Sequence, residues 1–118
     1  MNIFFISGTD TNVGKTEVTC GLMRLLSNQD KIVMAMKPIS AGIEKIGDKY
    51  LNQDVDKIMS EASVSSDLSK VNCYSFDQPI APHIAADKAN CKIDFNLIQS
   101  NLNYIKKNAD YVFIEGAG

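Results

Sequence analysis

The stretch FFISGTDTNVGKTEV, residues 4–18, joins an apolar run to a glycine-bounded loop and then to a helical pattern. Its loop ends in Gly14-Lys15-Thr16, as a phosphate-binding P-loop does, but five residues separate Gly8 from Gly14 where the usual pattern has four. In such a loop, backbone N–H groups and the helix dipole attract phosphate, the lysine reaches the terminal phosphates and the threonine hydroxyl can bind magnesium. The extra residue enlarges the loop without moving these groups, so the stretch predicts a phosphate site between a strand and a helix.

Three apolar runs, residues 3–7, 32–36 and 111–115, are continuous rather than alternating. Such runs are typical of strands buried on both faces, as in a parallel sheet that helices cover. The segments between them have helical periodicity. The third of these helices is expected to begin after Asp94, which would cap it. The apolar positions expected to face the core are Val18, Leu22, Leu25 and Leu26 in a helix over 15–27, Val55, Ile58, Met59 and Ala62 in residues 52–62, and Phe95, Ile98, Leu102 and Ile105 in the third helix.

The alternation of strands and helices predicts a doubly wound α/β fold, with a mainly parallel sheet and helices on both faces. With 45% hydrophobic and 22% charged residues, 1–118 has the composition of one globular domain. Residues 40–50 are predicted to form a long surface loop. Because a strand lies directly before the last residues, a small parallel sheet would have an open edge. We therefore expect 1–118 to be the N-terminal portion of a chain about twice as long, and to be inactive and poorly stable alone.

The net charge and the composition argue against some classes of binding partner. The net charge of −2 and the isoelectric point near 5.2 argue against a nucleic-acid partner, which usually meets a basic face. The apolar run at the N-terminus is shorter than a signal sequence or a membrane span, so we expect a cytoplasmic protein without membrane association. The three cysteines have neither a disulfide framework nor zinc-ligand spacing, which predicts reduced thiols.

Charged residues outside the loop fall where an α/β sheet places its ligands. Lys37 ends a predicted strand, Glu115 ends another, and Asp54 lies in the first turn of a predicted helix. Together with Thr16, the two carboxylates could form an oxygen-ligand magnesium site, because phosphates and waters would complete the octahedron. Taken singly, Lys37 could simply enter solvent, and each carboxylate could be a helix cap or a solvated charge.

Five motifs occur in an order that resembles dethiobiotin synthetase, the ATP-dependent cyclo-ligase family of biotin biosynthesis. They are GTDTNVGKT (8–16), KPISAG (37–42), Asn52 with Asp54, PIAPHIAA (79–86) and IEGAG (114–118). The five-residue loop is that family's own form of the P-loop. The resemblance covers residues 1–118, about the first half of such an enzyme, and implies a P-loop NTPase-type fold, ATP as co-substrate and a magnesium ion.

The resemblance also implies roles for individual residues. Lys37 and Lys15 are the expected catalytic residues, and Lys37 would contact both the reacting carbamate and the γ-phosphate. The magnesium ion would be held by Thr16, Asp54 and Glu115. The residues expected to bind ATP are Asn12, Val13, Gly14, Lys15, Thr16, Glu17, Asp54, Glu115, Gly116, Ala117 and Gly118. The adenine contacts and the substrate-carboxylate pocket come from the second half of the family's chain.

The substrate segment departs from the family pattern. The family usually reads Lys-Pro-Val-x-Ser/Thr-Gly, and this chain has Ala41 where the hydroxyl would stand, with a serine one residue earlier. The expected substrate residues are Lys37, Ser40 and Ala41, with the hydroxyl of Ser40 or the main chain of Ala41 in place of the missing side-chain contact. The single histidine, His83, is expected to lie in the segment lining the diamine pocket rather than to act as a base.

The implied reaction joins 7,8-diaminononanoate and CO2, supplied with bicarbonate, into a carbamate that ATP phosphorylates before the ureido ring closes. The family's substrate site is completed across a homodimer. Three alternatives remain at this stage. A corrin-pathway amidase typically has Gly-Pro-Asp-Tyr after the second strand's lysine, whereas this chain has KPISAG there. A nucleotide-switch ATPase carries a lysine early in the loop, where this chain has Asp10. A non-catalytic nucleotide-binding domain would bind ATP without releasing phosphate.

Overall fold

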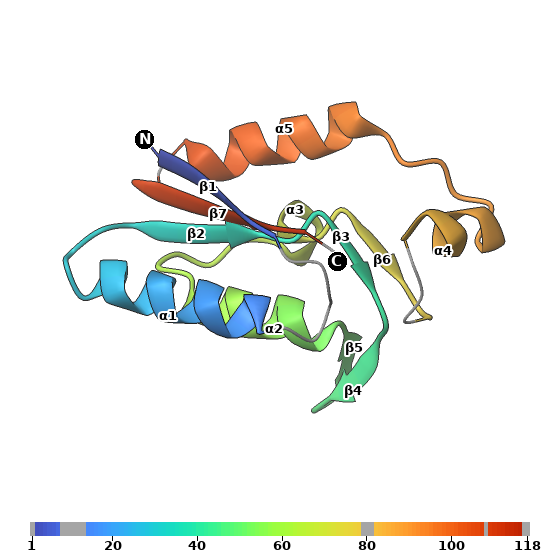
Figure 1. Cartoon of the computed structure of the whole chain (residues 1–118), viewed down its shortest axis with the longest axis horizontal. Helices are drawn as coiled ribbons and strands as arrows, with labels where there is room; N and C mark the ends of the chain where they lie inside the picture. The colour runs from blue at the N-terminus through green and yellow to red at the C-terminus, as the bar shows by residue number, and fades with distance from the viewer. Residues whose placement is uncertain (1, 8–13, 79–81, 108, 117–118) are drawn as a thin grey trace.

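A computed structural model describes residues 2–7, 14–78, 82–107 and 109–116. Three parallel strands form the main sheet: β1 (Asn2–Ile6), β7 (Tyr111–Glu115) and β2 (Val33–Met36), with β7 in the middle. The register pairs Ile6 with Glu115 and Met36 with Ile114, so the carboxyl ends of the strands meet at one edge (Figure 1). In an α/β sheet this edge is where ligands bind.

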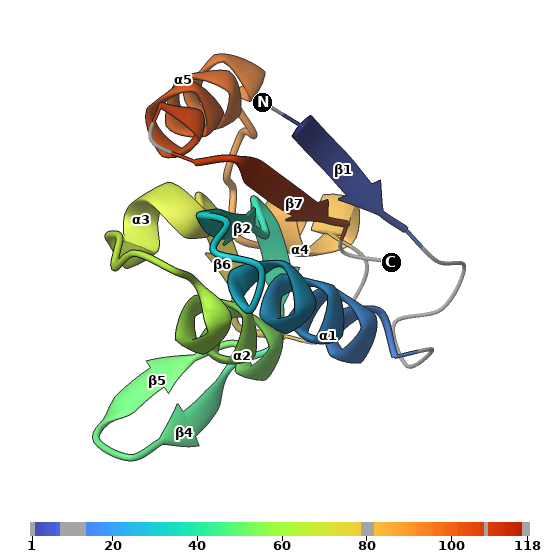
Figure 2. The ribbon, with the colours of Figure 1, turned by 90° about the vertical axis from the view of Figure 1, so that its left-hand side faces the viewer.

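Helices cover both faces of the sheet. On one face lie α1 (Lys15–Ser27) and α2 (Gln53–Glu61), which pack against each other and against β2 (Figures 1 and 2). On the other lies α5 (Phe95–Lys106), which packs against β2, β7 and the short α3 (Leu68–Val71). The doubly wound α/β fold is confirmed. Within the described residues, no helix has the length and apolarity needed to cross a bilayer.

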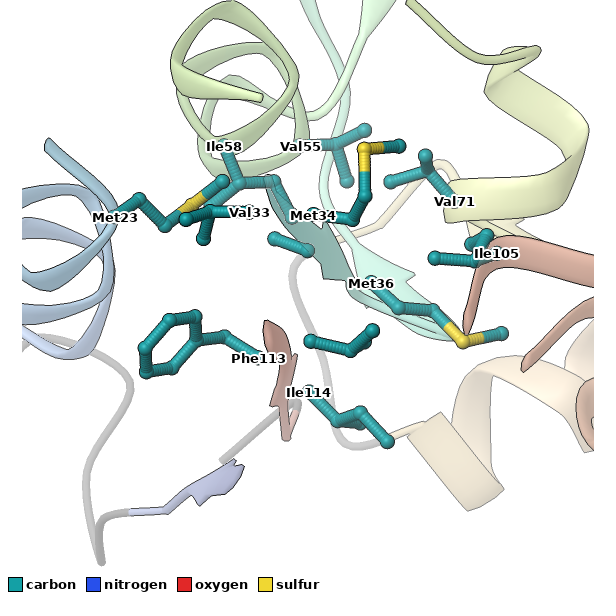
Figure 3. Close-up of a cluster of buried hydrophobic side chains, with 12 residues drawn as sticks. Met23, Val33, Met34, Met36, Val55, Ile58, Val71, Ile105, Phe113 and Ile114 are labelled. Atoms are coloured by element: carbon teal, nitrogen blue, oxygen red, sulfur yellow. The ribbon is translucent and has the colours of Figure 1, made fainter. Parts of the chain in front are cut away.

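The main core lies around β2 and β7, where aliphatic side chains from α1, α2, α3 and α5 converge (Figure 3). Val33, Met36 and Val112 are wholly buried. Burial on both faces is therefore confirmed for β2 and for most of β7. In α2, the predicted core positions Val55 and Ile58 are also wholly buried, because the helix packs flat on α1 and β2.

The expected burial of β1 is wrong. Phe4 and Phe5 are 44% and 75% exposed. The cause is position, since β1 forms an edge of the described sheet and pairs only with β7. Phe4 covers part of its surface by stacking on Phe113 and Tyr111, with ring centroids 5.5 and 6.1 Å apart.

The predicted core-facing side of α1 is wrong at three of its four positions. Val18, Leu22 and Leu25 are exposed, whereas Leu26 is half-buried against the core. The residues that the helix buries are Lys15, Thr16, Thr19 and Met23. The stripe at positions 16, 19 and 23 faces the sheet, where the hydroxyl of Thr16 donates to Glu115 Oε1 at 2.7 Å. The buried side of the helix therefore carries the polar site and is not the most apolar stripe.

In α5 the predicted core stripe holds only in part. Ile105 is buried, Ile98 and Leu102 are half-buried, and Phe95 at the helix start is 76% exposed. Phe95 and Phe5 both line an open, mainly apolar cavity of about 480 Å³ between α5 and the ends of the strands. The capping prediction is confirmed, because the Asp94 carboxylate accepts from the Asn96 N–H at 2.9 Å.

Residues 40–50 do not form the predicted loop. β3 (Ile39–Ala41) pairs in parallel with β6 (Tyr74–Phe76), and β4 (Glu44–Ile46) forms an antiparallel hairpin with β5 (Lys49–Leu51). Gly47 takes a positive φ of 62° at the tip, which a Gly-Asp two-residue turn accommodates without strain. The hairpin projects away from the sheet beyond α2 (Figure 2), and the remaining helix, α4 (Pro82–Lys88), packs on β3 and β6.

Candidate anion and metal site

The end of the predicted P-loop is anchored to the end of β7. Gly14 caps α1 in the left-handed conformation at φ 80°, which glycine adopts without steric cost. Directly after it, the Lys15 ammonium donates to the Gly116 carbonyl at 3.1 Å, and the Thr16 hydroxyl donates to the Glu115 carboxylate. Both side chains are buried. The first turn of α1 is thus fixed against the ligand edge of the sheet, as the glycine-loop pattern predicts.

Lys37 reaches the same place from the end of β2. It is 4% exposed, which rules out the alternative that it simply enters solvent. Its Nζ lies 3.1 Å from Glu115 Oε1, 3.2 Å from the Gly116 carbonyl oxygen and 3.9 Å from Asp54 Oδ2. Two lysines from distant parts of the chain therefore converge on one carbonyl oxygen.

The charges of the cluster are unequally paired. Lys37 lies close to both Glu115 and Asp54. Within the described residues, Lys15 forms no ion pair with a carboxylate, and its Nζ hydrogen-bonds a neutral carbonyl instead. A buried ammonium without a counter-charge is costly unless an anion binds beside it. The geometry therefore favours an anion next to Lys15, at the start of α1.

The two carboxylate oxygens of Glu115 have different surroundings. Oε1 accepts from Thr16 and Lys37, whereas Oε2 is buried and has no hydrogen-bond partner in the part of the chain that the structure describes. A buried, unpaired carboxylate oxygen is destabilising unless a cation or a donor occupies the space beside it. With the Thr16 hydroxyl and the half-exposed Asp54 carboxylate, it forms the hard oxygen set that magnesium prefers, so these residues fit the ion.

A larger acidic or histidine cluster is not involved. The described residues contain no group of three or more His, Cys, Asp or Glu side chains that could hold a metal. Magnesium bound to ATP needs few protein ligands, because phosphate oxygens and waters supply the others. The arrangement therefore suits a nucleotide-bound ion rather than a metal held by protein side chains alone.

Asp54 is held by the residue that caps its helix. Asn52 accepts from the N–H groups of Asp54 and Val55 at 2.9 and 3.2 Å, and its amide donates to the carbonyls of Ala41 and Gly42 at 3.2 and 3.0 Å. Asn52 therefore ties the end of β3 to the start of α2. An asparagine directly before a helical segment is a typical helix cap, so the sequence is compatible with this role of Asn52. Its contact with β3 joins residues that are 10 and 11 positions apart and cannot be inferred from local spacing.

The expected substrate residues have other partners in this structure. The Ser40 hydroxyl is wholly buried and lies 3.3 Å from Asn72 Oδ1, and the Ala41 carbonyl accepts from Asn52. A role of Ser40 or Ala41 in substrate binding stays a prediction. A side chain at Gly116 would meet only the Ile6 carbonyl, at an ordinary 3.9 Å, so among the described residues packing does not require glycine there.

Several predicted residues cannot be placed. Asn12, Val13, Ala117 and Gly118 lie outside the described residues, as does the side chain of His83. Glu17 is exposed, and its carboxylate accepts from Lys57 at 3.1 Å, which leaves its expected main-chain contact with ATP a prediction.

The cysteines take no part in the cluster. All three are free and half-buried, in agreement with the predicted reduced thiols. Burial raises the pKa of Cys20 and of Cys73, so these thiols are less ionised than an exposed cysteine at neutral pH. Neither is suited to nucleophilic catalysis, and the chemistry of the site rests on lysines and oxygen ligands.

The comparisons with known proteins agree with this geometry. The sequence model described as an AAA domain matches residues 2–118. The chain belongs to the AAA domain family. This match, together with the parallel sheet and the helices on both of its faces, confirms the predicted P-loop NTPase-type fold.

Among individual proteins, this AAA domain chain is similar to several named ATP-dependent dethiobiotin synthetase BioD. The identity is 42% to that of Nitrosospira multiformis, over 98% of this chain and 49% of the relative. It is 40% to that of Pseudoalteromonas translucida and 37% to that of Vibrio vulnificus, each over 100% of this chain and 52% of the relative. The resemblance that the five motifs predicted is confirmed, and the chain spans about half the length of these relatives.

Proposed function

We propose that residues 1–118 form the P-loop nucleotide-binding domain of an ATP-dependent dethiobiotin synthetase, a carbon–nitrogen ligase of biotin biosynthesis. The proposal is supported by relatives of that name, which match 98–100% of the chain. The single observation that carries it is the convergence of Lys15 and Lys37 on the Gly116 carbonyl, beside Glu115. One lysine suits a bound nucleotide, and the second suits a second oxyanion that reacts with it.

The reaction we propose begins with 7,8-diaminononanoate and CO2, which form a carbamate. The carbamate oxygen attacks the γ-phosphorus of ATP, and ADP leaves. The second amine then attacks the carbonyl carbon of the carbamic-phosphate intermediate, the ureido ring closes and inorganic phosphate departs. The intermediates are anionic and the reacting groups come from the substrates, so the protein needs no nucleophile of its own.

The catalytic contribution of the chain is to position and neutralise charge. Lys37 would lie between the carbamate and the γ-phosphate, and Lys15 would hold the phosphates against the start of α1. Their ammonium groups are already oriented by Glu115 and by the Gly116 carbonyl, so little reorganisation is needed as charge develops. Thr16, Asp54 and Glu115 would hold magnesium, which when bound neutralises charge on the β- and γ-phosphates.

The remaining partners follow from the same proposal. Main-chain N–H groups of residues 12–17 would bind the phosphates, residues 115–118 would lie beside the nucleotide, and Ser40 and Ala41 would approach the diamine. We propose a cytoplasmic homodimer without nucleic-acid or membrane partners. The net charge of −2 supports the absence of a nucleic-acid partner.

The test is phosphate release by the purified full-length protein with ATP and magnesium, with and without the diamine plus bicarbonate. The expected result is release that depends on the diamine and is lost in Lys37→Ala. The matched control is Lys31→Ala, which removes an exposed lysine outside the cluster and is expected to leave the rate unchanged. Release without the diamine would favour a switch ATPase, and ATP binding without any release would favour a non-catalytic nucleotide-binding domain.

A further inference from the structure

Asn72 lies directly behind the site, in the segment between α3 and β6. It is 8% exposed, and both ends of its side-chain amide are bound. Nδ2 donates to the Lys37 carbonyl at 2.9 Å and to the Tyr74 carbonyl at 3.2 Å, while Oδ1 lies 3.3 Å from the Ser40 hydroxyl. A buried polar side chain with this many partners specifies one arrangement of the strands around it.

The main chain of Lys37 is held from both sides by the same segment. The Lys37 N–H donates to the Val71 carbonyl at 2.9 Å, and its carbonyl accepts from Asn72. One residue further on, the Pro38 carbonyl accepts from the Tyr74 N–H at 2.8 Å. Residues 71–74 therefore clamp the bend that leads out of β2, where Pro38 has no N–H to contribute.

Two carbonyls determine which way the Asn72 amide faces. The carbonyls of Lys37 and Tyr74 can only accept, so Nδ2 faces them, and the Ser40 hydroxyl, which can donate or accept, donates to Oδ1. The opposite orientation would place the amide oxygen against two carbonyl oxygens. The hydroxyl of Ser40 therefore serves as the hydrogen-bond partner of Asn72 Oδ1. This gives the serine of KPISAG a structural role in addition to its predicted contact with the substrate.

We infer that Asn72 is a positioning residue for Lys37, and this inference rests on the proposed function for the role of Lys37 itself. A lysine side chain has a long, flexible stem, so the place of its ammonium depends on a fixed main chain. Lys37 Nζ meets Glu115 and the Gly116 carbonyl at 3.1 and 3.2 Å, and a shift of about 1 Å can cost a catalytic group on the order of 100-fold in rate.

The chain provides a matched control in Asn101. This asparagine of α5 is 3% exposed, and its amide donates to the Ser69 carbonyl in α3 and to the sulfur of Cys73, the residue after Asn72, both at 3.0 Å. It has no hydrogen bond to Lys37. Asn101→Asp therefore reproduces the loss of buried donors to this segment without touching the Lys37 main chain.

The first experiment compares Asn72→Asp with Asn101→Asp in the full-length protein, because aspartate keeps the shape but loses the amide donors. We expect Asn72→Asp to lower kcat for diamine-dependent phosphate release at least about tenfold, and Asn101→Asp to change it less than about twofold. Both variants are expected to lose comparable thermal stability. Equal losses of rate in the two variants would overturn the inference.

A second readout needs no turnover and separates this inference from the proposed function. Competitive acetylation followed by mass spectrometry measures the accessibility of Lys37 relative to Lys15. We expect the Lys37 to Lys15 labelling ratio to rise about fivefold in Asn72→Asp and to stay unchanged in Asn101→Asp. If the wild-type protein shows no diamine-dependent release, the proposed function fails while this ratio still tests the positioning role. An unchanged ratio in Asn72→Asp overturns the role even where the enzyme is active.

Discussion

At the carboxyl ends of β2 and β7 the charged side chains are buried, whereas along β1 and the outer side of α1 the apolar side chains are exposed. Lys37 and Glu115 are 4% and 1% exposed, and Phe5 and Leu25 are 75% and 55% exposed. Most folded proteins arrange these residue types the other way round. The difference shows that the described fold is organised around its polar site and not only around its apolar core.

The two regions differ in what their residues contact. Each buried charge at the site is held by specific partners, and one of these bonds, between Thr16 and Glu115, lies on the buried side of α1. The apolar side chains of β1 and outer α1 meet few partners within the described residues. Removing a charged residue that has a buried partner should therefore cost much more stability than removing an exposed apolar side chain.

The largest effect is expected for Glu115→Ala, which leaves Lys37 buried without its closest carboxylate. Breaking a buried pair in this way costs about 3–5 kcal/mol of unfolding free energy. Urea denaturation measures it, with Glu44→Ala on the exposed hairpin as the control. A loss below about 1 kcal/mol is the size expected for a solvent-exposed ion pair, and it would contradict the burial of the Lys37–Glu115 pair.

The next effect compares two apolar residues of α1. Met23 is wholly buried against the core and Leu25 is mostly exposed. Met23→Ala should lower the free energy of unfolding by about 2–4 kcal/mol, because it leaves a cavity between α1 and the sheet. Leu25→Ala should change it by less than about 0.5 kcal/mol. Equal costs in the same denaturation experiment would mean that the outer side of α1 is covered in the native protein.

A smaller effect is expected for Asn52→Ala, which removes the cap of α2 and its ties to β3. The loss should be about 1 kcal/mol, as for other helix caps. Asp94→Ala, which removes the cap of α5, is the control for stability. Only Asn52→Ala should also raise the magnesium concentration for half-maximal activity, by about tenfold, because it frees the turn that carries Asp54. A parallel rise in Asp94→Ala would contradict this link.

The smallest effect concerns the thiol of Cys20 in α1. Burial raises its pKa above the ordinary 9.0, with further contributions from Glu61, Glu17 and Glu115. Alkylation by iodoacetamide should therefore accelerate at a higher pH than in a model peptide. Because the folded state holds this proton more tightly, its contribution to stability is present below pH 9.0 and is lost above it, and Cys20→Ala should reduce that loss. A midpoint at or below that of the peptide would contradict the assignment.

Local sequence patterns predicted the parts of the structure that depend on local physics. The continuous runs of β2 and β7, the periodicity of α2 and the Asp94 cap are all encoded within a few residues. The hairpin at 44–51 was also readable, since Gly47 and Asp48 form a two-residue turn signal between two short strands. The strands on either side of this turn have only three residues each, which is too short for a clear strand periodicity.

What could not be predicted depends on contacts between distant residues. Periodicity placed the apolar side of α1 inward, but the side that faces the sheet is the one from which Thr16 bonds a residue 99 positions away. The exposure of β1 follows from its place at the edge of the sheet. For the site, strand ends and the glycine loop predicted that Lys15, Thr16, Lys37 and Glu115 would meet, whereas the support from Asn52 and Asn72 crosses between elements and leaves no local signal.

The central claim is that Lys15, the buried charge without a carboxylate partner among the described residues, belongs to an anion site and is not a requirement of the fold. Calorimetric titration of Lys15→Met with ATP and magnesium tests it most directly, because methionine keeps the length of the side chain and removes its charge. The account predicts ATP affinity about 10- to 100-fold weaker than in the wild-type protein, with the free energy of unfolding unchanged or raised, since Lys15 hydrogen-bonds only a neutral carbonyl among the described residues. Wild-type affinity, or a variant that fails to fold, would contradict it.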